Sequence, residues 1–139
     1  VKIVCVEETM HSTGSGCTYD DMRSMKNQNY DGIDRLTGLY NGEYALKEIQ
    51  AYMEQNPECT AAVYIMDIDN FRTVDETLGR LFGNEIMKEI AAAICQVFGK
   101  QAVIGRIGGD KFLIFEKNYE SVGRIRENAK ELCQFFYCL

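Results

Sequence analysis

The spacing of apolar positions divides this 139-residue chain into stretches that predict different elements. Val1 to Glu8 alternates between two sides, which predicts a strand. Ser12 to Gly16 has loop composition, and Asp20 to Tyr30 is polar with weak helical spacing. We therefore expect residues 1–33 to form an N-terminal strand and a linker, the tail of an upstream sensor.

Three later stretches repeat apolar side chains at helical intervals, which predicts three helices. The first runs from Tyr40 to Gln55. The second runs from about Asn84 to Phe98 and follows a loop that contains Gly79 and Gly83. The third runs from about Tyr119 to Phe136. Their apolar faces consist of Tyr44, Ile49, Tyr52 and Met53, of Ile86, Ile90, Ile94 and Val97, and of Val122, Ile125, Ala129, Leu132 and Phe136.

A continuous apolar run from Ala61 to Met66 has strand length and ends in Asp67 and Asp69. Such a run suits a strand buried on both faces, with its carboxylates emerging at the carboxyl end. In sheets packed against helices, ligands tend to bind at that end. The two acids can equally serve only to solubilise the strand end, and this alternative stays open.

Two short apolar runs, 102–105 and 112–115, flank a segment that contains Gly108 and Gly109. They predict a β-hairpin, because glycine accepts the positive φ angles that tight hairpin turns require. Asp110 then lies at or beside the tip, where an aspartate often serves the turn alone. Together with the acids after the 61–66 strand, it would form an oxygen site suited to Mg²⁺. The order helix, strand, helix, hairpin, helix predicts an α+β fold.

Composition narrows the range of partners. The hydrophobic content of 46% allows one core and a single domain, and the net charge of -6 argues against a nucleic acid polymer. A small anionic nucleotide remains compatible if a metal and local cations receive it. The longest apolar stretches are about six residues, far below the ~18 that a membrane span needs. We expect no membrane contact from this segment and a cytoplasmic location, alone or as the cytoplasmic part of a larger sensor.

The six cysteines include no C-x-x-C pair. We expect reduced core or surface thiols, with Cys95 and Cys133 buried in helices. His11 is the only histidine and is expected to be a solvated loop residue.

Three motifs, in this order, resemble those of the GGDEF family, the diguanylate cyclases that condense two GTP into cyclic di-GMP. Residues 34–41, DRLTGLYN, are similar to the family's opening D-x-L-T-G-L-x-N, and residues 67–72, DIDNFR, to its D-x-D-x-F-K segment. Residues 106–112, RIGGDKF, are similar to the signature R-x-G-G-[DE]-E-F. The resemblance implies that residues 34–139 form a palm-like antiparallel sheet, related to adenylyl cyclases and ferredoxin-like folds, packed against helices.

The resemblance also implies site residues. Asp67, the backbone carbonyl of Ile68 and Asp110 would bind Mg²⁺, which would neutralise the triphosphate and help to activate the attacking 3'-hydroxyl. Arg72 and Arg106 would contact phosphates, because such contacts need a fixed positive charge. Exposed arginines can also serve solvation alone. Gly108 and Gly109 belong to the nucleotide-binding set, and Asp110, Arg106 and position 111 to the catalytic set.

Lys111 stands where active cyclases carry a glutamate. Reversal of a unit charge within ~5 Å of a metal changes the local energy by several kcal/mol unless solvent screens it. We therefore expect cyclase activity to be lost or severely weakened. A lysine there can still pair with a phosphate, so nucleotide binding can survive.

The positions that match the family's guanine contacts, an asparagine and an aspartate, are here Asp75 and Asn84, with the two residue types exchanged. Guanine N1–H and N2–H favour a carboxylate, whereas N3 requires a donor. Asn84 can instead be the N-cap of the second helix, and Asp75 a solvated loop acid. Base selectivity is therefore open.

Two family elements are not matched. Residues 99–102, GKQA, replace the R-x-x-D of the inhibitory product site, so feedback there is not expected. The sequence ends at Leu139 after the third predicted helix, whereas the family continues through a further strand that flanks the sheet. Either the sequence is a truncated domain or another segment, such as Val1 to Glu8, covers that edge.

Three functions are compatible with these features. The preferred hypothesis is a degenerate GGDEF domain of a bacterial signalling protein, which binds GTP or a related purine nucleotide, or is regulatory, with weak or no cyclase activity. The second is an active, homodimeric diguanylate cyclase. The third is a structural dimerisation module without a ligand.

Overall fold

The structure is a computed structural model that describes residues 2–9 and 32–137. The predicted connector from Ser12 to Tyr30 lies outside the described residues, as do His11, Cys17 and Cys138. No helix in the described ranges is long and apolar enough to cross a lipid bilayer.

A five-stranded sheet, in the order β1-β3-β5-β4-β2, forms the centre of the fold. All neighbouring strands are antiparallel except the short pair β2 and β4, which is parallel. The strands are β1 (Lys2–Thr9), β2 (Tyr40–Asn41), β3 (Thr60–Asp67), β4 (Ala102–Arg106) and β5 (Lys111–Lys117). The helices are α2 (Gly42–Gln55), α3 (Phe71–Leu78), α4 (Arg80–Phe98) and α5 (Val122–Tyr137), with a 3₁₀ turn over Gly99–Gln101. The predicted α+β sheet packed against helices is confirmed.

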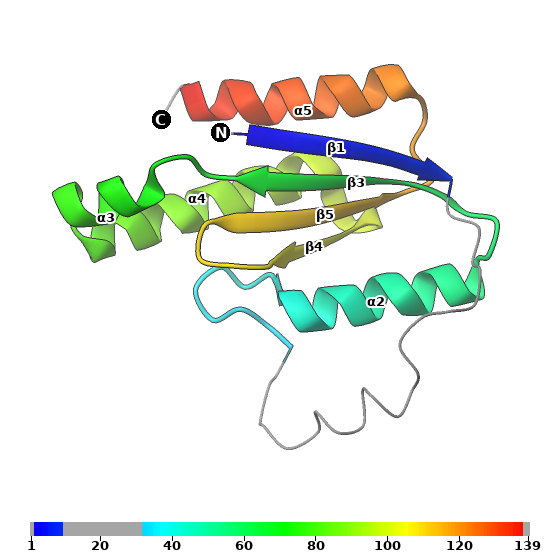
Figure 1. Cartoon of the computed structure of the whole chain (residues 1–139), viewed down its shortest axis with the longest axis horizontal. Coiled ribbons are helices and arrows are strands. Elements are labelled where there is room, and N and C mark those ends of the chain that lie inside the picture. The colour runs from blue at the N-terminus through cyan, green and yellow to red at the C-terminus, as the bar shows by residue number, and fades with distance from the viewer. Residues whose placement is uncertain (1, 10–31, 138–139) are drawn as a thin grey trace.

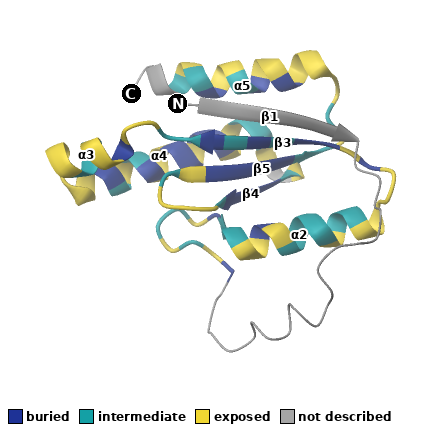
Figure 2. Cartoon of the chain, in the orientation of Figure 1, coloured by how far each residue is buried: buried dark blue, intermediate teal, exposed yellow. Residues whose placement is uncertain are grey.

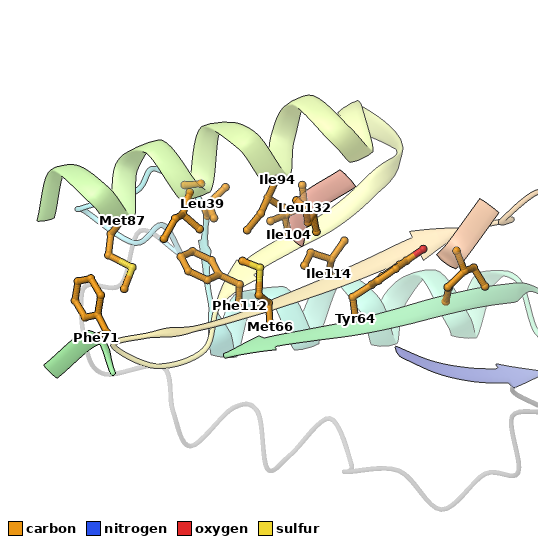
Figure 3. Close-up of a cluster of buried hydrophobic side chains, with 14 residues drawn as sticks. Leu39, Tyr64, Met66, Phe71, Met87, Ile94, Ile104, Phe112, Ile114 and Leu132 are labelled. Carbon is orange, nitrogen blue, oxygen red and sulfur yellow. The ribbon is translucent and has the colours of Figure 1, made fainter. Parts of the chain in front are cut away.

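Helices cover both faces of the sheet (Figure 1). On one face, α4 and α5 pack over alternate strand residues such as Met66, Phe112 and Ile114. Figure 3 shows Met87 and Ile94 of α4 pointing onto these side chains. On the other face, Ala45 of α2 packs in a smaller cluster with Phe115. The two faces alternate along β3 and β5 because successive strand side chains point to opposite sides.

Among the described side chains, the burial pattern of the helices matches the predicted apolar faces with two exceptions (Figure 2). Ile90, Ile94 and Leu132 are fully buried, as expected. Tyr44 and Val122 are 38% and 42% exposed, so their placement in the core was wrong. In α2, Ala45 takes the fully buried position, because the sheet approaches this helix closely: a Cβ on Gly105 would lie 2.6 Å from Ala45 Cβ. Cys95 is exposed and not buried, whereas Cys133 is partly and Cys59 fully buried; all three are free thiols.

The strand predicted for Val1 to Glu8 is confirmed. β1 pairs antiparallel with β3 over its whole length, from Lys2 opposite Asp67 to Thr9 opposite Thr60. It therefore covers the edge of β3 that would otherwise expose unpaired backbone groups.

The predicted start of the second long helix, at about Asn84, was too late. The segment before Asn84 is helical, because α3 occupies residues 71–78 and α4 begins at Arg80. Gly79 alone separates the two helices, with φ of 90°. Gly83, expected in a loop, lies in the first turns of α4, where its N–H bonds the carbonyl of Gly79 at 3.1 Å. Asn84 is therefore not an N-cap.

The predicted hairpin is confirmed, but the reason given for its glycines is wrong. β4 and β5 pair antiparallel, and Ile107 N–H bonds the Lys111 carbonyl at 2.9 Å to close a four-residue connection. Gly108 and Gly109 are absent from the described glycines that have positive φ. A four-residue connection spreads the reversal over more bonds than a two-residue turn, so it does not force these glycines into the left-handed region.

Candidate functional site

One end of the sheet gathers three segments that are distant in sequence. The carboxyl end of β3, the β4–β5 connection and the start of α3 all lie there (Figure 1). Ile68 N–H donates a 3.0 Å hydrogen bond to the carbonyl of Asp110. This bond ties the residue after β3 to the β4–β5 connection, residues 107–110, which we call the signature turn. The two acidic segments predicted to lie together are therefore adjacent.

The opening motif, residues 34–41, forms a turn that leads into α2. The Asp34 carboxylate accepts from the Thr37 backbone N–H at 2.9 Å and from its hydroxyl at 2.6 Å. Gly38, with φ of 74°, donates its N–H to the Asp34 carbonyl at 2.8 Å. Asn41 then caps α2, since its side chain accepts from Tyr44 N–H at 2.8 Å. This motif thus builds a structural turn beside the site.

Arg106 joins this turn to the signature turn. Its guanidinium lies 3.3 Å from the Asp34 carboxylate and donates to the Gly109 carbonyl from Nη2 at 2.6 Å and from Nε at 3.2 Å. The predicted phosphate contact of Arg106 stays a prediction, but each of its three nitrogen atoms already donates a hydrogen bond to Asp34 or Gly109. In the structure, Arg106 positions the glycine turn through its two bonds to the Gly109 carbonyl.

The Asp34 carboxyl group is ionised more readily than an ordinary aspartate. Burial opposes its ionisation, but the hydrogen bonds from Thr37 and the nearby Arg106 charge outweigh this, so the pKa of Asp34 is lowered. The charge-assisted bonds to Arg106 therefore persist at neutral pH.

Lys111 and Asp67 lie directly opposite each other on β5 and β3. The Lys111 ammonium is 3.9 Å from Oδ2 of Asp67, and both side chains are about half exposed. The position that carries a glutamate in the motif of active cyclases thus holds a cation against the first acid of the D-x-D segment.

A hollow of about 330 Å³ opens at the same end of the sheet. This volume is at the lower end of the range usual for small-molecule sites. The hollow lies between α3, the start of α4 and the signature turn, and three arginines outnumber two aspartates on its wall. It is lined by Phe71, Arg72, Asp75, Arg80, Asn84, Arg106, Gly109 and Asp110. Six of the predicted site residues are thus brought together on one surface, whereas Asp67 and Lys111 are not part of this wall.

Asp75 is a half-buried acid of α3 and not the solvated loop acid considered as an alternative. Its Oδ1 is buried and has no hydrogen-bond partner among the described residues. It fits only because residue 83 is glycine, since a Cβ there would lie 2.0 Å from this oxygen. A buried carboxylate oxygen without a donor is costly, so a donor on a ligand would relieve it.

Gly108 and Gly109 have no structural requirement in the described part of the chain. A Cβ on Gly109 would meet nothing within 4 Å, and one on Gly108 would meet only Lys111 Cβ at 3.7 Å. Neither φ nor packing therefore explains why these residues lack side chains. Glycine also serves where a ligand must approach the backbone closely, and the hollow borders Gly109.

The arrangement disfavours a divalent cation at Asp67. Mg²⁺ needs oxygen ligands at 2.0–2.1 Å, and the ammonium of Lys111 already faces this carboxylate. Within residues 2–9 and 32–137, no three His, Cys, Asp or Glu side chains gather as metal ligands do. Asp110 and the carbonyl of Ile68 remain as oxygen donors, and their role stays a prediction.

Sequence reasoning missed two residues of the site, Arg80 and Phe71. The signal for Arg80 was the long apolar spacing of α4, which extends back to Leu81 once Gly83 is accepted within a helix. Phe71 was part of a quoted motif, but its burial under the hollow depends on the α3–α4 pairing, which the spacing did not show.

Comparison with known proteins places these features in a family. The family model described as diguanylate cyclase, GGDEF domain, matches residues 32–136. The chain is 31% identical over 108 residues to the probable diguanylate cyclase DgcT of Escherichia coli, covering 71% of this chain and 23% of DgcT. It is 31% identical over 85 residues to the cyclic di-GMP phosphodiesterase PdeR of Escherichia coli, covering 61% of this chain and 13% of PdeR.

Solved structures show the same fold. The GGDEF domain of DgcB from Caulobacter crescentus aligns with a TM-score of 0.66 at 23% identity, covering 76% of this chain and 62% of that chain. The GGDEF domain of FimX from Pseudomonas aeruginosa aligns with a TM-score of 0.67 at 18% identity, covering 74% and 64%. The chain spans less than a quarter of the length of DgcT and PdeR. Because the family model matches most of the chain, this protein belongs to the GGDEF domain family of cyclic di-GMP signalling proteins.

Proposed function

We propose that this chain is a degenerate GGDEF domain that binds GTP or a related purine nucleotide and has weak or no cyclase activity. It acts as a regulatory module of a bacterial signalling protein, in the cytoplasm, and receives its input from an upstream sensor. Family membership supports the signalling context. The remaining points rest on the site.

The observation that carries the proposal is the Lys111–Asp67 pair. Condensation of two triphosphates builds negative charge that a cyclase stabilises with metal ions and a correctly placed acid. In this chain Lys111 replaces the acid, and its ammonium lies 3.9 Å from the carboxylate of Asp67. The loss of that negative group, and the competition at Asp67, both lower turnover.

Nucleotide binding is supported by the hollow itself. Arg72 and Arg80 are exposed on its wall and can donate to phosphate oxygens, although Arg72 Nε also pairs with Glu76 at 2.9 Å. The unpartnered Oδ1 of Asp75 suits an N–H donor, which a guanine edge offers at N1 and N2. The bare glycine turn leaves room for phosphates to approach the backbone.

GGDEF domains generally use Mg²⁺. In this chain Asp110 and the Ile68 carbonyl are the oxygen donors that would hold Mg²⁺ whenever the nucleotide brings it, and the ion would supply charge neutralisation of the phosphates.

Calorimetric titration with GTP, paired with chromatography for cyclic di-GMP, tests the proposal. Binding without product is the expected result. The variant Arg80→Gln should weaken binding, whereas Arg124→Gln, which removes an exposed charge from α5 that pairs with Glu127, should leave it unchanged. No binding by the parent protein would overturn the proposal in favour of a structural dimerisation module.

A working homodimeric cyclase is the second candidate. The Ile68 to Asp110 hydrogen bond favours it, since it keeps the two acidic segments adjacent. Formation of cyclic di-GMP by the parent protein would establish this candidate instead. If binding occurs without product, Lys111→Glu should raise turnover; no gain would assign the defect to Asp75 and Asn84.

A further inference from the structure

The Lys111–Asp67 pair is fixed by the sheet. The two residues are Cα partners in the β3–β5 ladder, so their side chains project from the same face. The ladder continues through Met66 and Phe112, whose side chains are fully buried on the opposite face. A shift of register would move these core residues into solvent, so the ammonium is held beside the carboxylate.

An ammonium and a divalent cation compete for this carboxylate. Mg²⁺ bound to Asp67 would lie about 2 Å from an oxygen that the Lys111 ammonium approaches to 3.9 Å. The two positive groups would then repel each other at short range. Because both side chains are about half exposed, water screens part of this repulsion, and the lysine lowers metal affinity without abolishing it.

The same pair changes the net charge at the end of the sheet where the hollow opens. An unpaired carboxylate at Asp67 would repel a phosphate unless a metal lay between them. Lys111 cancels that charge within the protein. The hollow at the same end of the sheet carries Arg72, Arg80 and Arg106 against Asp75 and Asp110. Arg72 also pairs with Glu76, and Arg106 with Asp34. Lys111 therefore neutralises one carboxylate at this end of the sheet without a contribution from a metal.

We propose that Lys111 is a built-in counter-ion that replaces the divalent cation at Asp67, so that the hollow binds a nucleoside triphosphate without metal. The statement about the nucleotide rests on the function proposed above. The statement about the cation does not, because it concerns only Lys111 and Asp67.

The cation is tested first, on the ligand-free protein. Thermal unfolding is followed during titration with MgCl₂ or MnCl₂ for the parent protein, Lys111→Glu, Lys111→Gln and Lys117→Gln. Lys117 is the matched control, since it lies at the other end of β5, over the ring of Tyr52. The Tm of Lys111→Glu and Lys111→Gln should rise with metal concentration and saturate, whereas the parent and Lys117→Gln should show a much smaller shift over the same range of concentration. A saturable shift of equal size in the parent would overturn the proposal.

The nucleotide is tested by calorimetry with GTP in EDTA and in excess Mg²⁺. The Kd of the parent should change less than about threefold between the two conditions, and Lys111→Gln should bind about tenfold more weakly in EDTA and regain affinity with Mg²⁺. Lys111→Arg should keep the metal-free binding. Tenfold tighter binding by the parent in Mg²⁺, or no loss in Lys111→Gln, would overturn the inference. Absence of GTP binding by the parent in both conditions would instead refute the proposed function and leave the metal titration as the test of Lys111.

Discussion

The Arg106 guanidinium lies 3.3 Å from the Asp34 carboxylate although 72 positions separate the two residues in the sequence. Both side chains are largely buried, with exposed fractions of 15% and 22%. Because Arg106 also holds the Gly109 carbonyl, the pair connects the start of the domain to the signature turn.

Removal of this connection should destabilise the domain. Asp34→Ala leaves Arg106 without its partner and the Thr37 turn without its acceptor, and we expect a loss of roughly 2 kcal/mol in the free energy of unfolding. Urea denaturation measures it. The exposed pair of Glu43 and Lys47 provides the control: Glu43→Gln should change stability by less than about 0.5 kcal/mol. Equal effects of the two variants would contradict the structural role of Asp34.

The contribution of Asp34 should also depend on pH. Its pKa is lowered in the folded state from an ordinary value of 3.8, so its stabilisation is present in full above that value and is lost as the pH falls through the lowered folded pKa. The difference in unfolding free energy between the parent and Asp34→Asn should be constant near neutral pH and shrink below pH 3.8. A difference that grows on acidification would have the wrong sign for this assignment.

Deletion of residues 1–9 should expose the edge of β3. The ladder with β1 spans eight residue pairs, from Lys2 opposite Asp67 to Thr9 opposite Thr60. Unpaired strand edges promote association with other chains. We expect a lower Tm and a larger species in sedimentation velocity, both reversed when a peptide of residues 1–9 is added. An unchanged Tm would show that β3 does not depend on this strand.

The apolar spacing predicted β3, the β4–β5 hairpin and the interior of α4, because each is decided by burial of its own side chains. Asn84 and Asp75 were misplaced for one reason. A glycine inside a helix lowers local propensity, so Gly83 suggested a loop. In the structure, Gly83 is required by a tertiary contact with Asp75, which no local pattern reveals.

The candidate site was predictable in part. The motifs named Asp67, Asp110 and Lys111, and the strand register then brings Lys111 opposite Asp67. The pairing of Arg106 with Asp34 was not predicted, since a contact across 72 positions depends on how α2 and β4 pack. The hollow's contribution from Arg80 depends in turn on the α3–α4 arrangement.

The Gly83 contact is itself testable. Gly83→Ala places a Cβ 2.0 Å from Asp75 Oδ1 and 3.0 Å from Phe71 Cζ, so the clash should outweigh the gain in helix propensity of roughly 1 kcal/mol. The double variant Asp75→Ala with Gly83→Ala should recover most of the loss in thermal unfolding. Gly123→Ala in α5, where the nearest atom is Ser121 Oγ at 3.6 Å, should be neutral or slightly stabilising. Additive effects of the two substitutions would exclude the contact.

Substitution of Gly105 and of Gly109 should have different effects, because packing requires a glycine at 105 and only a ligand would require one at 109. A Cβ on Gly105 would lie 2.6 Å from Ala45 Cβ, whereas a Cβ on Gly109 would meet nothing within 4 Å of the described chain. Gly105→Ala should therefore lower the free energy of unfolding by about 1–3 kcal/mol through overpacking. Gly109→Ala should change it by less than about 0.5 kcal/mol, as for surface substitutions.

Binding should show the opposite order. Because the hollow borders Gly109, a methyl group there would obstruct a phosphate that approaches the turn, and GTP should bind about tenfold more weakly to Gly109→Ala. Calorimetry at a temperature where Gly105→Ala remains folded should give that variant nearly the parent affinity, since Gly105 is buried under α2 on the far side of β4 from the hollow. If Gly109→Ala binds GTP as tightly as the parent, the turn does not receive the phosphates, and they must contact Arg72 and Arg80 without the signature glycines.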